Sequence, residues 1–280
     1  MDAYLLPSLA SATGMMIVAI VAVVYWRQRT HVQARWFWAG AGLWAIAVVS
    51  KILCAVLTNA AVIGFLKEQF SYPLFVVGGG LFVGIESSLF EIGLTFLAVL
   101  IWPQLGRDPR RAIGIGIGSG AFEAFLMGLA LLIGVLVAVG RTAAGSDNAW
   151  SDVEAAARIT PLFWLRFPVE RIMIILCHAS CRALVLLGTT KKMPMAVLWG
   201  FLIFALLDAV AGGVQISGRL GSFSAWWCVL ANLPFALVSV FILRWCETRW
   251  GKREDDEAGS VSATYPAAPA DMEEPQADRF

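Results

Sequence analysis

Seven stretches of the sequence are long and apolar enough to cross a lipid bilayer. They lie at about 8–26, 36–58, 72–101, 112–139, 168–190, 194–213 and 224–245. A helix needs roughly 20 apolar residues to span the hydrocarbon core, and only helices or closed barrels satisfy their backbone hydrogen bonds there. The sequence therefore predicts an all-α polytopic membrane bundle of about seven transmembrane helices.

The composition agrees with a membrane protein. Hydrophobic residues make up 59% of the chain and charged residues only 15%, whereas a soluble domain has about 25% charged residues. No basic patch interleaved with aromatic residues occurs, which argues against a nucleic-acid-binding protein. Membrane lipid is the expected partner, and no nucleic acid is expected.

Lys and Arg residues are divided unevenly between alternate connections. One side carries eleven of them, including Arg27, Arg110 and Lys191, and the other side carries five, including Arg141 and Arg219. Lys and Arg accumulate in cytoplasmic loops. We therefore predict a multi-pass protein of the cell membrane with its N-terminus outside and its C-terminus in the cytoplasm.

The composition changes near the end of the last span. Residues 1–246 form the predicted transmembrane domain, and residues 247–280 are rich in charged residues, Ala, Pro and Ser. Such a segment buries little apolar surface, so we predict a disordered, acidic cytoplasmic tail. Before that, Ser151 and Glu154 have capping-box spacing, which predicts a short helix that stops before Pro161.

Small residues recur within two of the predicted spans. The fourth span has Gly116, Gly120, Ala124 and Gly128 at steps of four, a pattern that lets a neighbouring helix approach closely. The third span contains a run of three glycines at 78–80, which would permit a kink or a strong tilt. We expect the fourth span to pack against another helix through its small residues.

The fifth span carries ionisable residues along one face. Steps of four align Glu170, Ile174, His178 and Arg182, and Arg171 joins the same side. An ionisable side chain near the bilayer centre costs roughly 2.5 to 3.5 kcal/mol on insertion scales. This face is therefore expected to point into the bundle or into a water-containing cavity.

Six ionisable residues from five spans are predicted to gather near the middle of the bilayer. A rise of 1.5 Å per residue gives depths above the inner surface of ~17 to 18 Å for His178 and Glu123, ~21 to 22 Å for Lys51, Glu86 and Asp208, and ~15 Å for Glu91. One interpretation is structural, with acids and bases neutralising one another, for instance Lys51 with Asp208. The excess of acids favours chemistry instead, because a carboxyl beside a histidine is the arrangement that water activation or proton transfer requires.

The cysteines do not indicate a disulfide framework or a metal site. Cys177 and Cys181 flank His178 at helical spacing, but there is no CxxC motif and no second histidine nearby. We therefore predict neither a metal nor another cofactor.

Three short motifs, in the order of the successive spans, resemble those of the YhfC family of intramembrane proteases. They are Gly118-Ser-Gly-Ala-Phe-Glu-Ala124, Val169-Glu-Arg171 followed by His178, and Phe204-Ala-Leu-Leu-Asp208. The family belongs with the prenyl-protein (CAAX) protease-like membrane peptidases and is related to a scaffold subunit of gamma-secretase. The resemblance covers about residues 10–245.

The resemblance and the polar cluster together nominate the candidate site. In such proteases a membrane-embedded Glu, usually in a Glu-Glu pair, activates water with the help of histidines from neighbouring helices. The candidate catalytic residues are Glu86, Glu91, Glu123, His178 and Asp208. The candidate structural polar network consists of Lys51, Glu170, Arg171 and Arg182.

The chain departs from the family pattern at three places. Where the Glu pair is expected, the sequence reads Glu86-Ser87-Ser88, and the two expected histidines are replaced by Ser119 and Phe204. The fold is therefore better supported than the proteolysis. We expect a residual protease cavity in which hydrolysis is weak or absent.

Several functions remain open at this point. The leading one is a protein that binds transmembrane segments in this cavity. An active glutamic-type intramembrane peptidase, with Glu86 or Glu91 as base and His178 as its partner, is an alternative, and it is the expected reaction class if the protein is an enzyme. A small proton-coupled transporter is another alternative, although no inverted repeat is visible. A serine protease that uses Ser119 is disfavoured, since no GxSxG-type turn surrounds it.

Overall fold

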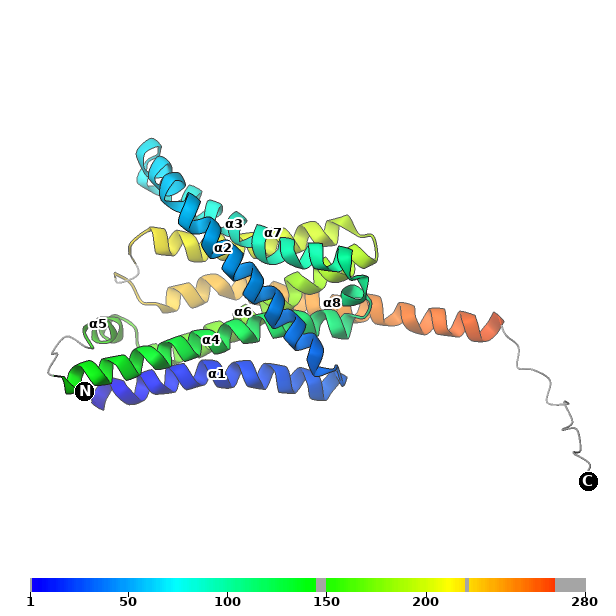
Figure 1. Ribbon diagram of the computed structural model, residues 1–280, viewed down its shortest axis with the longest axis horizontal. Coiled ribbons are helices and arrows are strands. Elements are labelled where there is room, and N and C mark those ends of the chain that lie inside the picture. Colours follow the sequence, from blue (N-terminus) through cyan, green and yellow to red (C-terminus); the bar gives the residue numbers. More distant parts are fainter. Residues whose placement is uncertain (1, 145–149, 220–221, 265–280) are drawn as a thin grey trace, which may run out of the picture.

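The computed structural model describes residues 2–144, 150–219 and 222–264, with side chains up to Trp250, and within these residues it contains eight α-helices, one 3-10 helix and no strand (Figure 1). The helices are α1 (Asp2–Thr30), α2 (Ala34–Gln69), α3 (Tyr72–Ile101), α4 (Pro109–Ala143), α5 (Ser151–Ile159), α6 (Phe163–Thr190), α7 (Pro194–Ile216) and α8 (Trp226–Thr264), with the 3-10 helix η1 (Pro103–Gly106) between α3 and α4. The predicted all-α membrane bundle is confirmed.

Seven of these helices are long and apolar enough to cross a membrane, counted over the described residues. They are all the α-helices except α5, and they correspond to the seven predicted spans. Helix α2 is longer than predicted, since it continues to Gln69 instead of ending near residue 58. Its 36 residues make a helix ~54 Å long, and Figure 1 shows it lying obliquely across the bundle.

Proline residues mark the beginnings of several helices. Pro73, Pro109 and Pro194 lie in the first turns of α3, α4 and α7, where the missing N–H is not needed and the fixed φ angle suits a helix. Asp108 caps α4, since its carboxylate accepts a hydrogen bond of 2.9 Å from the Arg110 backbone N–H. These local signals in the sequence determine where α3, α4 and α7 begin.

Helix α6 is the centre of the bundle. It packs against α1, α3, α4, α7 and α8, and 72% of its most apolar window is buried, compared with 6% for α2. The ionisable face of α6 therefore lies inside the protein, as predicted from the cost of exposing charge to lipid.

The small residues of α4 face neighbouring helices. A Cβ atom added to Gly116 would lie 2.5 Å from Ala179 Cα of α6, and one added to Gly120 would lie 2.9 Å from Ile175 Cα. At Gly128 the neighbour is α1, with Met16 Cγ at 2.7 Å. The predicted close packing is confirmed, because only a residue without a side chain fits such distances.

The glycines of α3 serve packing rather than a break in the helix. Helix α3 is continuous from Tyr72 to Ile101. A Cβ atom on Gly80 or Gly84 would collide with the backbone of α7, at Ala209 in both cases. These glycines therefore let α3 and α7 approach closely along their length.

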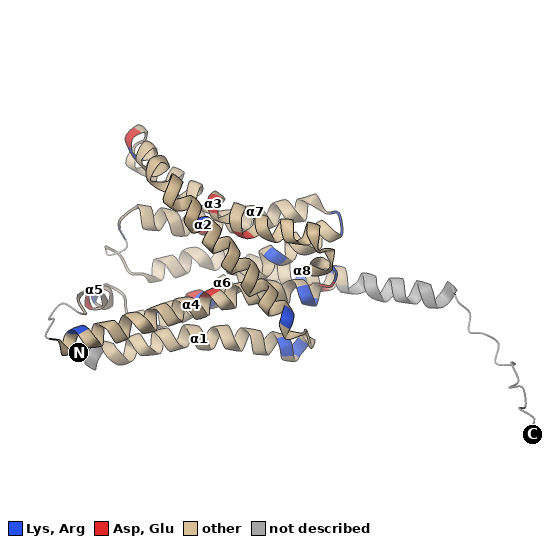
Figure 2. Ribbon diagram, viewed as in Figure 1, with Lys and Arg blue, Asp and Glu red and all other residues tan. Residues whose placement is uncertain are grey.

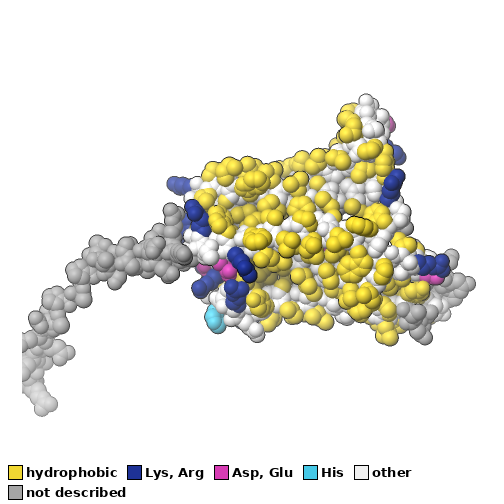
Figure 3. Space-filling model, turned by 180° about the vertical axis from the view of Figure 1, so that it is seen from behind, with side chains coloured by type: hydrophobic (Ala, Val, Ile, Leu, Met, Phe, Trp, Pro, Cys, Tyr) yellow, Lys and Arg dark blue, Asp and Glu magenta, His cyan; other side chains and the backbone are white. Residues whose placement is uncertain are grey.

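The outer surface suits a lipid environment. Figure 3 shows hydrophobic side chains covering the middle of the molecule, and Figure 2 shows Lys and Arg gathered mainly at the end where α1 stops and α4 begins. Large apolar side chains such as Leu57, Ile101 and Phe241 are 72 to 86% exposed. Membrane-embedded helices with such a surface contact lipid.

The connection after α4 and the C-terminal segment were also predicted. The short helix is confirmed as α5, which ends at Ile159, before Pro161. Helix α8 continues past the predicted domain boundary at residue 246 as far as Thr264. The last part of the predicted tail, residues 265–280, lies outside the described residues.

Candidate intramembrane polar site

A cavity of about 730 Å³ lies among the membrane-spanning helices. Residues from α2, α3, α4, α6, α7 and α8 line it. It is lined by all five candidate catalytic residues and by three of the four residues of the predicted network: Glu86, Glu91, Glu123, His178, Asp208, Lys51, Glu170 and Arg171. The fourth, Arg182, is completely buried and reaches the cluster through Glu91.

Glu123 of α4 is held by three donors. His178 Nε2 lies 2.9 Å from its Oε2 atom, and Arg171 Nη1 donates to Oε1 at 2.7 Å. Trp44 Nε1, from α2, donates to Oε2 at 3.2 Å. Glu123 and His178, which the sequence placed at the same depth, are therefore in contact, and Glu123 joins α2, α4 and α6.

Glu91 of α3 is held equally firmly. Lys51 Nζ, from α2, donates to Oε1 at 2.8 Å, and Arg182 Nη2, from α6, donates to Oε2 at 3.2 Å. The second Arg182 nitrogen, Nη1, donates to the Glu91 carbonyl oxygen at 2.7 Å and also to the Thr95 hydroxyl. Glu91 is only 3% exposed. Its buried carboxylate is therefore paired with two cationic side chains inside the bundle.

The structural interpretation of the sequence paired Lys51 with Asp208. In the structure Lys51 pairs with Glu91 instead. Ser87 and Glu91 lie one turn apart on α3 and face α2, so Lys51 Nζ reaches both, at 2.9 Å and 2.8 Å. Asp208 instead accepts a hydrogen bond from the Ser87 hydroxyl. Lys51 binds a residue of α3 because its own helix, α2, packs on α3.

The remaining network residues extend the cluster along α6. Glu170 lies 3.7 Å from Arg166 and 3.6 Å from Arg171, measured between the nearest nitrogen and oxygen atoms. Because Arg171 also binds Glu123, the predicted ionisable face of α6 is a connected chain of charges from Arg166 to His178.

Glu86 stands apart from this network. It is buried and lines the cavity, but its Oε1 atom has no hydrogen-bond partner among the described residues. Asn232 Oδ1, from α8, is in the same situation on the cavity wall. Asn232 and Trp44 were missed by sequence reasoning, because an uncharged polar group in an apolar helix gives no signal of where it points.

The structure also argues against a serine protease that uses Ser119, which the sequence already disfavoured. Ser119 is completely buried, and its hydroxyl donates to the Gly40 carbonyl oxygen at 2.8 Å. It therefore helps to join α4 to α2 and makes no hydrogen bond to His178. Phe204, at the other position where the family has a histidine, packs edge-on against the His178 ring with centroids 5.1 Å apart.

Comparison with protein families agrees with this arrangement. A family model described as "YhfC intramembrane metalloprotease" matches residues 14–222, which is well over half of the chain. Neither the search of curated proteins nor that of solved structures gives a match. The family description implies a metal ion, for which the side chains of the cavity are the possible ligands.

These residues do not fit a divalent metal ion. A metal needs three or four donors with free lone pairs that converge on one point. Each oxygen of Glu91 and Glu123 already accepts a hydrogen bond from a cation or histidine, and the described residues contain no group of three suitable ligands. Lys51 and Arg171 also line the cavity and would repel a dication.

Cys177 and Cys181 do not supply the missing ligands. Cys181 packs with Ile92, Val185 and Phe204, and Cys177 packs with Ile174 and Leu207. Both cysteines behave as small hydrophobic residues in the core, as predicted.

The three sequence motifs thus meet at one cavity, with Glu123 on α4, Glu170, Arg171 and His178 on α6, and Asp208 on α7. They do so within the part of the chain that the family model matches. By its sequence match over residues 14–222, this seven-span membrane protein belongs to the YhfC intramembrane metalloprotease family.

Proposed function

We propose that this chain binds transmembrane segments of other proteins in its polar cavity and hydrolyses peptide bonds weakly or not at all. The observation that carries the proposal is the pairing of its two central carboxylates with cationic or histidine donors. Each oxygen of Glu91 and Glu123 is engaged by Lys51, Arg182, Arg171 or His178. Such donors stabilise the charged carboxylate, so it removes a proton from water less readily.

Donors for the developing oxyanion are also scarce. Ser119 and Phe204 replace the two histidines that the family pattern has, and one of them is bonded to backbone while the other is apolar. Loss of one such donor commonly costs ~10²- to 10³-fold in rate. The combined changes support a protein that still binds transmembrane segments in the cavity but hydrolyses peptide bonds weakly or not at all.

The size and lining of the cavity support a peptide segment as the ligand. One helical turn ~10 Å wide and 5.4 Å long occupies roughly 400 Å³, so about 730 Å³ has room for one to two turns. Glu86 and Asn232 line the cavity, and each has one buried side-chain oxygen without a partner in the described residues, so a small turn of either side chain would offer an acceptor to the N–H groups of an unwound segment. Non-helical backbone is tolerated at membrane depth only where it is buried in protein or lines a water-filled cavity.

A second candidate function is an active intramembrane peptidase with a rearranged site. It is favoured by the short contact between His178 Nε2 and Glu123 Oε2, 2.9 Å, inside a cavity. In this candidate the Glu123–His178 pair serves as the base, and the reaction is hydrolysis of a peptide bond within a membrane-spanning segment.

Reconstituted protein and a panel of membrane-spanning peptides separate the two candidates. A photo-crosslinking residue at Met127, on the cavity wall, is expected to capture peptide, while one at Leu57, 82% exposed on α2, is expected to capture much less. Mass spectrometry of the peptides is expected to find no cleavage. Equal capture at both positions would remove the binding proposal.

Cleavage would be tested with His178→Ala and Glu123→Gln. Hydrolysis that both changes abolish would establish the second candidate and overturn the first. Hydrolysis that neither change affects would mean that the Glu123–His178 pair is not the reactive group.

We further propose that the protein lies in the cell membrane with its N-terminus outside and its acidic C-terminal tail in the cytoplasm. The proposal rests on the eleven-to-five division of Lys and Arg. Arg107, after η1, and Arg158, on α5, are exposed residues of connections that should lie on opposite sides.

Cysteine labelling tests this orientation in a variant whose half-exposed Cys54 and Cys228 are replaced by Ala. A membrane-impermeant maleimide added to intact cells is expected to label Arg158→Cys, and to label Arg107→Cys only after permeabilisation. The reverse pattern would invert the topology, and labelling of both from one side would contradict the number of spans.

A further inference from the structure

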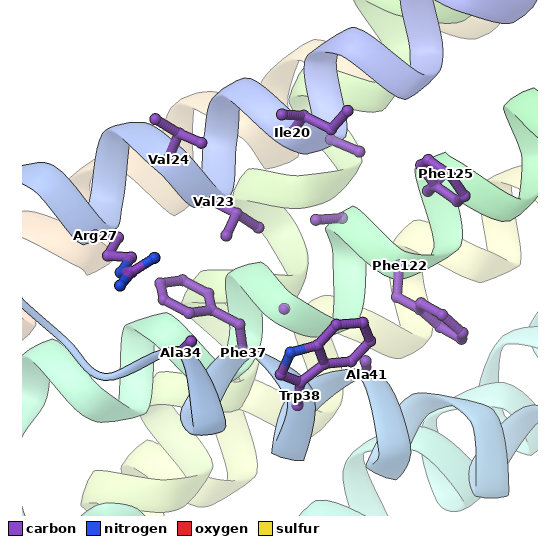
Figure 4. Close-up of a pocket in the computed structure, with 13 residues that line it drawn as sticks. Ile20, Val23, Val24, Arg27, Ala34, Phe37, Trp38, Ala41, Phe122 and Phe125 are labelled. Carbon is purple, nitrogen blue, oxygen red and sulfur yellow. The ribbon is translucent and has the colours of Figure 1, made fainter.

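An apolar groove of about 280 Å³ lies on the outside of the bundle, separate from the polar cavity. It runs between α1, α2 and α4, and its walls include Val23, Phe37, Trp38 and Phe125 (Figure 4). The groove shares no lining residue with the polar cavity.

A single cation, Arg27, lines one end of the groove. Figure 4 shows Arg27 beside Phe37 and Ala34 at one end, with Phe125 at the other. None of the described acidic side chains forms an ion pair with Arg27, whereas Arg29 on the same helix lies 3.5 Å from Glu247. Arg27 is therefore an exposed guanidinium whose charge is not matched by any of the described acidic side chains.

The groove is charged at one end and apolar along the rest of its length, as a site for an amphiphilic ligand would be. Arg27 lies in the last turn of α1, at the end of the bundle where Lys and Arg gather (Figure 2). Ile20, seven residues earlier on α1, lies ~10 Å deeper along the helix and is apolar. A ligand with an anionic head at Arg27 and a hydrocarbon chain along Val23 and Ile20 matches both ends.

We propose that this groove binds one anionic phospholipid, with its phosphate at Arg27 and one acyl chain between α1, α2 and α4. Size argues against a partner helix, since a seven-residue helical stretch ~10 Å wide and ~10 Å long occupies roughly 800 Å³. Charge complementarity argues for an anionic headgroup, because Arg27 is the one charged residue on the groove wall.

A second apolar hollow provides an internal comparison. It lies between α6, α7 and α8, has a volume of about 660 Å³, and is lined by apolar residues such as Trp199, Pro234 and Ile242, with no charged residue on its wall. Lipid held there has no reason to be selected by headgroup charge. The two hollows therefore differ in the property that the proposal concerns.

The headgroup is tested by native mass spectrometry of the full chain, purified with equal amounts of phosphatidylglycerol and phosphatidylcholine. The wild-type protein is expected to retain one phosphatidylglycerol preferentially. Arg27→Gln is expected to lower this preference by roughly 5-fold, the effect of one basic side chain at a membrane surface. The matched control Arg29→Gln removes a charge from the same turn and is expected to leave the preference unchanged.

The acyl-chain part is tested with Val23→Phe, which narrows the groove and leaves Arg27 in place. This variant is expected to retain less of both lipids while melting at the wild-type temperature. Trp199→Ala, in the uncharged hollow, is expected to keep the wild-type preference for phosphatidylglycerol. Equal losses in Arg27→Gln and Arg29→Gln, or wild-type lipid retention in Val23→Phe, would overturn the proposal.

Discussion

Replacement of Arg182 by Met is expected to destabilise the protein by about 3 to 5 kcal/mol, the cost of removing one partner from a buried ion pair. Arg182 is completely buried and binds both the side chain and the carbonyl of Glu91, as well as Thr95. Methionine has a similar length but no donor. The Glu91 side chain would keep Lys51, but its buried Oε2 atom would lose the guanidinium that donates to it, and its carbonyl oxygen would keep the Thr95 hydroxyl as a donor.

Thermal unfolding in detergent measures the effect, with an expected fall in melting temperature on the order of 10 °C. Arg29→Met is the control, because the Arg29–Glu247 pair is exposed, with 53% of the Arg29 side chain accessible. An exposed pair of this kind contributes about 0 to 1 kcal/mol. If the two variants melted alike, Arg182 would not be acting as a buried counter-charge.

Replacement of Gly116 by Leu is expected to destabilise the bundle by about 3 kcal/mol, the upper end of the usual cost of overpacking. A Cβ atom at Gly116 would lie 2.5 Å from Ala179 Cα and 2.8 Å from the His178 carbonyl oxygen. These neighbours are backbone atoms of the central helix α6, so they cannot move aside as a flexible side chain would. Helices α4 and α6 would have to separate.

Gly134→Leu provides a matched control on the same helix. Gly134 lies within α4, and nothing lies within 4 Å of a Cβ atom added there. Leucine is a better helix former than glycine by roughly 0.8 kcal/mol, so this variant is expected to be neutral or slightly stabilised. A similar loss of thermal stability in both variants would contradict the close packing at Gly116.

Separation of α4 and α6 would also disturb the polar site. Glu123 lies on α4, and its partners Arg171 and His178 lie on α6. Their contacts of 2.7 Å and 2.9 Å depend on the same approach that Gly116 and Gly120 allow. The small residues of α4 and its carboxylate therefore act together, because the close contact between the α4 and α6 backbones brings Glu123 within reach of Arg171 and His178.

The sequence by itself determined the features that depend on local composition. Seven apolar segments of sufficient length specify seven membrane-spanning helices, because an unpaired backbone is too costly in lipid. Helical periodicity likewise determined which face of α6 is polar and which face of α4 is small, since both follow from steps of four along one helix. The membership of Glu123, His178 and Asp208 in one cluster was accessible from depth alone.

Only the tertiary structure decided which groups pair within that cluster. Depth along a helix does not give the rotation of one helix about its axis relative to another. By depth alone Lys51 matched Asp208, both at ~21 to 22 Å, better than Glu91 at ~15 Å. Packing of α2 on α3 selected Glu91. The same rotation turned Ser119 toward Gly40 and brought Asn232 to the cavity wall. Hydrogen bonds act over about 3 Å, so these assignments depend on helix packing that no single segment encodes.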